Sequence, residues 1–278
     1  AVALAMGGCD LVVNFAAESH VDRSIESPGE FIQTDIHGVF VLCEEARQRG
    51  VKRFLQVSTD EVYGEVLEGA ATEDWPLMPR SPYAASKAGG DRLAFAYWAT
   101  YGLPVVVTRC SNNYGPRQYP EKLVPLFVTN AIEDQPLPVY GTGKNRRDWI
   151  HVEDHCAALV ALLAQPGVEG ETFNIGAGNE LDVLAMTEAI LRLLGKPASL
   201  VRHVEDRPGH DRRYALDSSK LSRLTGWRPA ASFDEGIRQT VEWYRANEAW
   251  WRPIKAGEFR AYYERAYGRR KVLKEGQA

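Results

Sequence analysis

Three short apolar runs, each followed by polar or small residues, constrain the fold of this chain more than any other feature. They cover residues 11–15, 51–57 and 104–110, and segments with a helical pattern at about 29–49 and 82–101 separate them. Parallel strands need a crossover connection, which is usually a helix of this length. The sequence therefore predicts an α/β fold built on a doubly wound parallel sheet.

The second apolar run leads directly into four polar residues, Ser58, Thr59, Asp60 and Glu61. In an open parallel sheet, ligands bind just beyond the carboxyl ends of the strands. Two carboxylates beside two hydroxyls form an acid/base set, but the same residue types also cap helices and turns. Adjacent residues in an extended backbone point opposite ways, so both carboxylates can serve one site only if the strand has ended in a turn.

Tyr83 and Lys87 lie four residues apart on a predicted helix and therefore share one face. A nearby ammonium group stabilises a phenolate and lowers the tyrosine pKa, and such a tyrosine can accept a hydroxyl proton while hydride leaves the same carbon. A surface Tyr–Lys pair is common, so the spacing alone is a weak signal. Combined with a strand that ends in Ser58 and Thr59, it indicates a redox site.

Composition excludes several kinds of partner. The net charge of −4 provides no global basic field for nucleic acid, so local arginines must meet any anionic ligand. No apolar run approaches the roughly 18 to 20 residues that cross a bilayer, and no basic region marks a signal peptide at the start. The four cysteines form no CxxC pair, and we expect reduced thiols in a cytoplasmic protein.

Two local patterns are set aside. His151 and His155 suggest a metal site, but we expect the first in a strand and the second in the next helix, so we predict no metal. Residues 141–144 lack the spacing and final Ser/Thr of a P-loop and are interpreted as a hairpin turn. Further on, we expect a helix over 233–250 and a mobile basic tail after Gly268.

A series of sequence blocks resembles the dTDP-glucose 4,6-dehydratases of the extended short-chain dehydrogenase/reductase family. In chain order, the blocks cover residues 15–22, 58–64, 83–87, 112–116, 120–123, 147–149 and 206–210. The adjacent Asp60 and Glu61 favour this family over GDP-mannose dehydratases and UDP-glucuronate decarboxylases, which typically show Ser-Glu, and over epimerases, which need no such pair.

The resemblance implies a Rossmann-type NAD-binding domain over 1–113, to which 148–176 returns, and a smaller domain over 114–278 that mainly binds a nucleotide sugar. It also implies a homodimer through the helices near 31–49 and 83–101, and a place in deoxysugar synthesis. The first strand and glycine-rich turn of the family have no counterpart before Leu11. We therefore expect that an N-terminal βαβ unit is missing, and that a chain truly complete as it stands would retain NAD weakly.

The activity implied is NAD-dependent dehydration of dTDP-glucose to dTDP-4-keto-6-deoxyglucose. Tyr83, helped by Lys87 and Thr59, accepts the C4 hydroxyl proton while hydride passes to NAD. Glu61 then removes the C5 hydrogen, Asp60 protonates the departing C6 hydroxyl, and hydride returns to C6. A related epimerase or decarboxylase, or a truncated inactive binding protein, are the alternatives.

The resemblance assigns two sets of binding residues. Two positions depart from the family pattern, because Asp35 and Glu180 stand where we expect asparagine. The implied NAD-binding residues are Ala16, Ala17, Ser19, Thr34, Ser58, Tyr83, Lys87 and Asn113. The implied substrate-binding residues are Ser19, Thr59, Asn112, Lys122, Leu123, Pro138, Tyr140, Arg147, Arg207 and His210.

Overall fold

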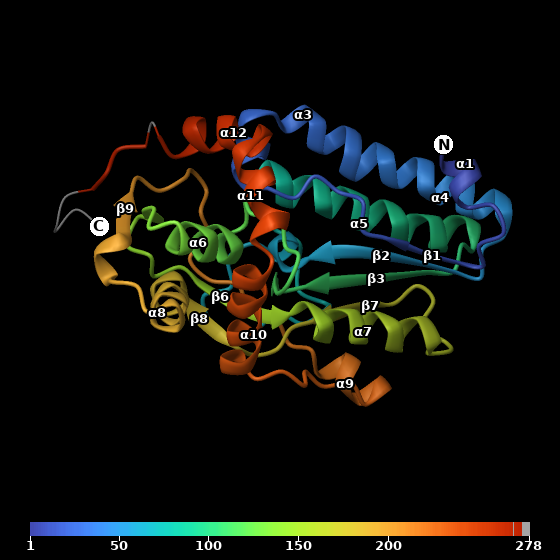
Figure 1. Ribbon diagram of the computed structural model, residues 1–278. Helices are drawn as coiled ribbons and strands as arrows, with labels where there is room; N and C mark the ends of the chain where they lie inside the picture. Colours follow the sequence, from blue (N-terminus) through green and yellow to red (C-terminus); the bar gives the residue numbers. More distant parts are fainter. Residues whose placement is uncertain (269, 274–278) are drawn as a thin grey trace.

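A four-stranded parallel sheet in the order β1-β2-β3-β7 organises the first part of the protein (Figure 1). The computed structural model describes residues 1–268 and 270–273. The strands are β1 (Leu11–Asn14), β2 (Arg53–Thr59), β3 (Val105–Cys110) and β7 (Thr172–Ile175). This confirms the predicted parallel sheet. Its register pairs Thr59 with Cys110, so the polar residues after β2 and β3 lie at the same edge.

Helices cover both faces of this sheet. Alternate residues of a strand point to opposite faces, and the apolar side chains on each face pack against helices. Phe54 packs in a cluster with α4 (Gly38–Arg49) and α5 (Pro82–Tyr101). Leu55 and Val57 pack in a second cluster with α7 (Val152–Ala164) and α9 (Ser219–Thr225). Figure 1 shows the two pairs of helices on opposite sides of the strands. The doubly wound arrangement is therefore confirmed.

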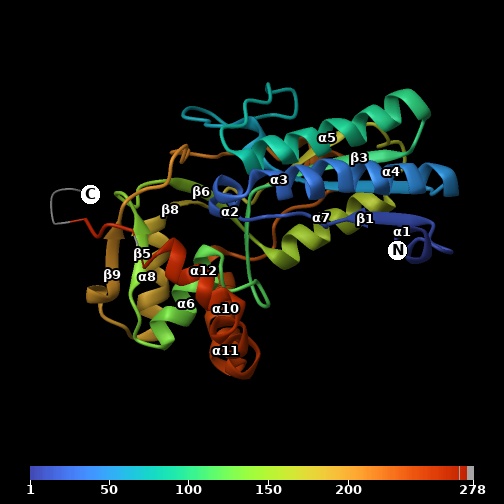
Figure 2. The ribbon, with the colours of Figure 1, turned by 90° about the horizontal axis from the view of Figure 1, so that it is seen from above.

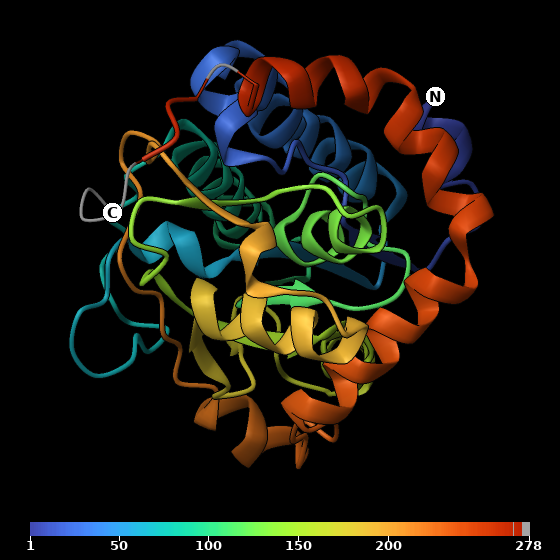
Figure 3. The same cartoon turned by 60° about the vertical axis from the view of Figure 1, so that its left-hand side comes forward.

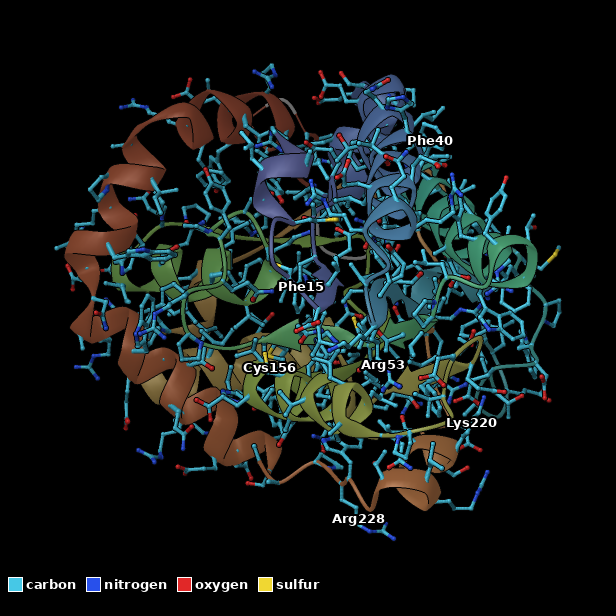
Figure 4. All side chains as sticks on the ribbon, turned by 90° about the vertical axis from the view of Figure 1, so that its right-hand side faces the viewer. Phe15, Phe40, Arg53, Cys156, Lys220 and Arg228 are labelled. Carbon is cyan, nitrogen blue, oxygen red and sulfur yellow. The ribbon has the colours of Figure 1, made fainter. Side chains whose placement is uncertain are left out.

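The far end of the sheet is fixed by Arg53, the first residue of β2. Its Nη1 donates to the carbonyl oxygens of Leu162, Leu163 and Gln165 at 2.8, 3.0 and 2.6 Å, and so caps the last turn of α7. Figure 4 shows Arg53 at this end, opposite the carboxyl ends of the strands.

The connection from β1 to β2 is helical, as expected, but it is not one regular helix. After α1 (Val2–Ala5) and β1, the chain forms α2 (Val21–Glu26), α3 (Pro28–Phe31), a π-helix η1 (Ile32–His37) and then α4. The π-helix packs closely on α5, where a side chain at Gly90 would clash with the carbonyl oxygen of Asp35. Irregular π segments often occur at functional sites.

The second part of the protein lies beside the carboxyl ends of β2 and β3 (Figure 2). One sheet contains β4 (Asn112–Tyr114), β6 (Arg146–His151) and β8 (Glu180–Asp182), and a two-stranded sheet contains β5 (Leu137–Tyr140) and β9 (Val201–Val204). Around them pack α6 (Leu123–Ile132), α8 (Val183–Leu194), α10 (Phe233–Ala246), α11 (Glu248–Ala256) and α12 (Glu258–Ala266). Phe127, Met186, Tyr244 and Trp251 are central to the core.

Several expectations need correction. The helix expected over 233–250 breaks at Asn247, whose backbone leaves the helical region and separates α10 from α11. Residues 141–144 form a turn but no hairpin, because β5 pairs with β9 and β6 pairs with β4 and β8. Part of the tail after Gly268 lies outside the described residues. The domain boundary at 113/114 stays a prediction. Within the segment 148–176, which we expected to return to the first domain, β7 does join the sheet of the first part.

Candidate active site

The catalytic candidates lie where β2 ends in a short 3₁₀ turn, η2 (Asp60–Tyr63). The Thr59 hydroxyl accepts a hydrogen bond from the Glu61 amide at 3.3 Å and donates one to Asp60 Oδ1 at 3.1 Å. Thr59 therefore caps the turn, which was one of the two interpretations of these polar residues in the sequence. The strand ends directly before the carboxylates, which is the condition under which adjacent carboxylates can serve one site.

The two carboxylates differ in their surroundings. Burial raises the pKa of Asp60 well above its usual value, and the charge of Glu61 adds to this rise. Among the described residues, Asp60 Oδ2 has no hydrogen-bond partner. Burial also raises the pKa of Glu61, but the nearby Arg207 and Arg147 oppose that rise. Asp60 is therefore suited to hold a proton, and Glu61 is the better of the two at staying ionised.

Tyr83 and Lys87 face this turn from the first half of α5. Lys87 Nζ donates to the carbonyl oxygen of Val57 at 2.9 Å, and burial lowers the pKa of the lysine while the charge of Asp35 raises it. Burial raises the pKa of Tyr83 well above 10, and a hydrogen bond with Thr59 acts in the opposite direction. The sequence suggested a lowered tyrosine pKa. The structure differs because desolvation of the phenol dominates.

A cavity opens on Glu61 and runs into the second part of the protein. All predicted substrate-binding residues except Thr59 line it: Ser19, Asn112, Lys122, Leu123, Pro138, Tyr140, Arg147, Arg207 and His210. Thr59 contacts Glu61 instead, through the turn that it caps. Residues from five of the other sequence blocks, and from two sheets, therefore share one space with Glu61.

Three cations form the middle of the cavity wall. Arg147 donates from Nη2 to the carbonyl oxygen of Asp211 at 2.9 Å, and its guanidinium lies 4.3 Å from the ring centre of Tyr214. Arg207 Nη1 lies 3.5 Å from Asp22 Oδ2, while its buried Nε has no partner among the described residues. Lys122 Nζ donates to the Ser19 carbonyl oxygen. Guanidinium and ammonium groups held in this way can bind a diphosphate.

The cavity also contains residues that sequence reasoning missed. An apolar region contains Leu126, Phe127, Trp149 and Val183, and the apolar pattern of residues 123–132 could have indicated the first two. His20 and Asp22 belong to the first matching block, so their position in that block was a usable signal. Tyr267 comes from the other end of the chain, and no sequence signal places it here.

Most of the predicted cofactor residues lie outside this cavity, whereas Ser19 lines it. Ala16 and Ala17 follow β1 and offer little side-chain bulk, and the buried Ser58 Oγ has no partner among the described residues. Asn113 is fixed, because its Oδ1 lies 2.9 Å from His155 Nδ1 and its Nδ2 donates to the Ser111 carbonyl oxygen at 3.0 Å. Small residues and an unused hydroxyl beside Lys87 fit a bound dinucleotide. Thr34 is half-buried on η1.

Both departures from the family pattern have local partners. Asp35 accepts hydrogen bonds from the Glu18 amide at 2.9 Å and from Ser86 Oγ at 2.7 Å, and so joins the loop after β1 to α5. Glu180 pairs with Arg146 at 2.8 Å and with Arg213 at 2.6 Å. These ion pairs lower the pKa of Glu180, and its charge is balanced rather than free to repel an anion.

The described residues contain no cluster of three or more histidine, cysteine or carboxylate side chains that could hold a metal ion. His151 ends β6 and His155 lies in α7, as expected from the sequence. His155 instead contacts Asn113. None of the helices in the described part of the chain has the length and apolar character needed to cross a membrane.

Comparison with known proteins identifies the family. A model described as GDP-mannose 4,6 dehydratase matches residues 3–240. The dTDP-glucose 4,6-dehydratase of Streptomyces niveus is 53% identical, with 90% of this chain and 74% of that protein covered, and that of Xanthomonas campestris pv. campestris is 51% identical, with 90% and 77% covered.

A solved structure points the same way. The dTDP-glucose 4,6-dehydratase DesIV from Streptomyces venezuelae, with NAD and TYD bound, superimposes with a TM-score of 0.89 at 52% identity and covers 91% of this chain and 79% of that one. The enzyme from Bacillus anthracis, in complex with NAD, gives 0.81 at 48% identity, covering 88% and 76%. The chain therefore belongs to the dTDP-glucose 4,6-dehydratase family.

Proposed function

We propose that the protein converts dTDP-glucose to dTDP-4-keto-6-deoxyglucose by NAD-dependent dehydration, with the catalytic residues expected from the sequence. One observation carries this proposal: Glu61 opens into the same cavity as Arg147 and Arg207. A nucleotide sugar whose diphosphate meets the arginines can thus present its hexose to the turn at the end of β2.

NAD would be held by Ala16, Ala17, Ser19, Thr34, Ser58, Tyr83, Lys87 and Asn113. When bound, it supplies the hydride acceptor for oxidation at C4 and the hydride donor for reduction at C6. The Lys87 ammonium, fixed by the Val57 carbonyl oxygen, would contribute a positive charge to the redox site when NAD is bound. The Asn113 amide is oriented by His155 from the neighbouring helix.

In the first step, the Tyr83 phenol oxygen takes the proton of the C4 hydroxyl. A phenol with a raised pKa is protonated at neutral pH, so this step requires its proton to leave first or to move in concert. The Thr59 hydroxyl would turn its proton from Asp60 Oδ1 to the phenolate oxygen, and this hydrogen bond would lower that cost. Thr59 thus links the oxidation step to the turn that carries both carboxylates.

In the second step, Glu61 and Asp60 remove water from C5 and C6. The C4 ketone acidifies the C5 hydrogen, and the Glu61 carboxylate takes that proton while Asp60 gives its own proton to the departing C6 hydroxyl. The environment suits both roles: the raised pKa of Asp60 keeps its proton available, and two arginines favour ionised Glu61. The pair then exchanges states, and a proton returns to C5 as C6 is reduced.

The remainder of the cavity would select the nucleotide. Lys122, Arg147 and Arg207 meet the diphosphate, and the apolar region with Phe127 and Pro138 receives the base. Asn112 also lines the cavity, and its buried Oδ1 has no partner among the described residues, so it is free to contact the hexose.

We also propose that the protein is a homodimer that associates through α4 and α5. In support, the exposed fractions of Phe40 on α4 and Tyr101 on α5 are 42% and 57%. Figure 4 shows Phe40 on the outer side of α4. Sedimentation equilibrium would measure the dimer, and a monomer at micromolar concentration would contradict the dimer proposal.

All cysteines of the chain are free thiols, which supports a cytoplasmic location.

The decisive experiment offers dTDP-, UDP- and CDP-glucose side by side to the protein with NAD and identifies the sugar product. We expect a 4-keto-6-deoxy sugar from dTDP-glucose and much slower turnover of the other two. An epimerised product, or no product although both NAD and dTDP-glucose bind, would overturn the proposal.

A further inference from the structure

The C-terminal helices reach back to the beginning of the chain. Figure 3 shows α10, α11 and α12 following one another around the second part of the protein, with α12 ending beside the helices of the first. The Tyr262 hydroxyl lies 3.3 Å from His20 Nδ1, and the guanidinium of Arg23 lies 4.3 Å from the Tyr262 ring centre. Beyond α12, Val272 bridges to Val204 of β9. The C-terminal segment therefore joins both parts of the protein at the cavity wall.

Asp22 lies where this segment meets the cavity. Its Oδ1 accepts hydrogen bonds from Arg270 Nη2 at 2.7 Å and from the Tyr140 hydroxyl at 3.3 Å, and its Oδ2 lies 3.5 Å from Arg207 Nη1. The guanidinium of Arg270 also lies 4.4 Å from the Tyr140 ring centre. A single buried carboxylate thus holds two residues expected to contact substrate, and a third residue from beyond α12.

The charges of this cluster decide what Asp22 does to a bound anion. With only Arg207 as partner, the Asp22 carboxylate would cancel the arginine charge and oppose a diphosphate. The neighbouring His20 does not help, because burial lowers its pKa to about 3 and the ring is neutral. Arg270 adds the second positive charge. One carboxylate and two guanidiniums leave a net positive charge on the side of Arg207.

We propose that Arg270 is a positioning residue for nucleotide-sugar binding: it neutralises Asp22, so that the charge of Arg207 remains available to the substrate diphosphate. This inference rests on the proposed function. It also assigns the C-terminal segment a part in binding, although the matched family model ends at residue 240. Arg270 itself need not touch the ligand, since it acts through Asp22 and Tyr140.

A purely structural role is the competing explanation. Arg270 donates from Nε to the Ala266 carbonyl oxygen at 2.9 Å and from Nη1 to that of Glu205 at 3.1 Å, so it also caps α12 and ties it to the chain after β9. Loss of these bonds would loosen the cavity for any ligand. Loss of the neutralising charge would weaken only the binding of anionic ligands, and would do so only while Asp22 is ionised.

The test compares Arg270→Met, Asp22→Asn and the double variant in the NAD-loaded protein, with binding of dTDP and of uncharged thymidine measured by calorimetry. We expect Arg270→Met to weaken dTDP binding about tenfold and thymidine binding less than twofold. Adding Asp22→Asn should restore most of the lost dTDP affinity, because the uncompensated carboxylate is gone. Arg260→Ala, on the preceding helix α12 and 72% exposed, serves as the control and should change neither affinity.

The outcomes separate the two proposals. If the unaltered protein does not bind dTDP, the proposed function fails before the variants matter. If it binds dTDP, but Arg270→Met weakens dTDP and thymidine equally, or the double variant loses affinity additively, then Arg270 acts only as a structural cap and the inference is overturned. Unchanged dTDP affinity in Arg270→Met would overturn it as well.

Discussion

Two sides of the candidate site carry charge in opposite ways. The first wall is the turn after β2 with Tyr83 and Lys87, and the second is the cavity lining that contains Arg147 and Arg207. At the turn after β2, Asp60 is buried and Glu61 is half-buried, each with few partners, and both have raised pKa values. In the second wall, Arg147 is held by a carbonyl oxygen and Arg207 by a carboxylate. An ionised group without a partner is costly to bury in a protein interior, whereas an ionised group with a partner is stabilised there. This contrast supports the proposal that the first wall moves protons and the second binds the nucleotide sugar.

The largest effect should come from the wall that moves protons. Glu61→Gln preserves the shape of the side chain but removes the base, so we expect turnover to fall about 10²- to 10⁴-fold, the usual range for general base assistance. Oxidation at C4 should survive, because Tyr83 and Lys87 are unchanged. Rapid mixing that follows the absorbance of reduced cofactor would therefore show that it forms and persists.

Glu68→Gln is the matched control for this experiment. Glu68 is exposed on the loop after the turn, so its replacement should leave turnover unchanged. Full dehydration by Glu61→Gln would exclude Glu61 as the base. Loss of the oxidation step in that variant would show that the two half-reactions are not separable in this site.

The binding wall should respond in KM rather than in kcat. Arg147→Met removes a cation expected to contact the diphosphate but leaves the turn intact, so we expect KM for dTDP-glucose to rise about 10- to 100-fold, as for the loss of a charge-assisted contact. The adjacent Arg146 is 54% exposed and pairs with Glu180, which makes Arg146→Met the natural control. A fall in kcat with unchanged KM in Arg147→Met would contradict the division between the walls.

The sequence predicted the first wall more completely than the second. Ser58 to Glu61 follow directly from a buried strand, and Tyr83 and Lys87 share a helix face, so local patterns and the family blocks were sufficient. The second wall combines Asp22, near the start of the chain, with residues near its end. Contacts between such distant segments depend on how α10, α11 and α12 pack, and the break at Asn247 was itself unpredicted. The π-helix at Asp35 was missed for a similar reason, since its packing against α5 determines it.

The raised pKa of Asp60 should also make the free energy of unfolding depend on pH. The folded-state pKa of Asp60 lies above its unfolded value, so the folded state binds the proton more tightly, and this contribution to stability is lost as pH rises through the folded pKa. Asp60→Asn carries no such charge. We expect the variant to be more stable than the unaltered protein by about 1–3 kcal/mol at pH 8, the cost of an unsatisfied buried group, and by less at pH 5.

Urea denaturation at both pH values measures this difference. Asp74→Asn on the exposed loop serves as the control, and should shift the free energy of unfolding equally at pH 5 and pH 8. A stability gain for Asp60→Asn that does not grow with pH would mean that Asp60 titrates normally. Burial would then not set the protonation of Asp60, and the contrast between the walls would be lost.

The smallest effect should come from Glu180, which departs from the family pattern and lies on β8, the strand that pairs with the strand of Arg147. Its ion pairs with Arg146 and Arg213 balance its charge, so Glu180→Gln should change KM for dTDP-glucose less than twofold. Partly exposed pairs of this kind contribute about 0.2–1 kcal/mol to stability, and the variant should lose no more than this in thermal or urea unfolding. Much tighter substrate binding by Glu180→Gln would instead show that the carboxylate repels the diphosphate, and that pairing beside the binding wall does not neutralise charge as fully as the contrast requires.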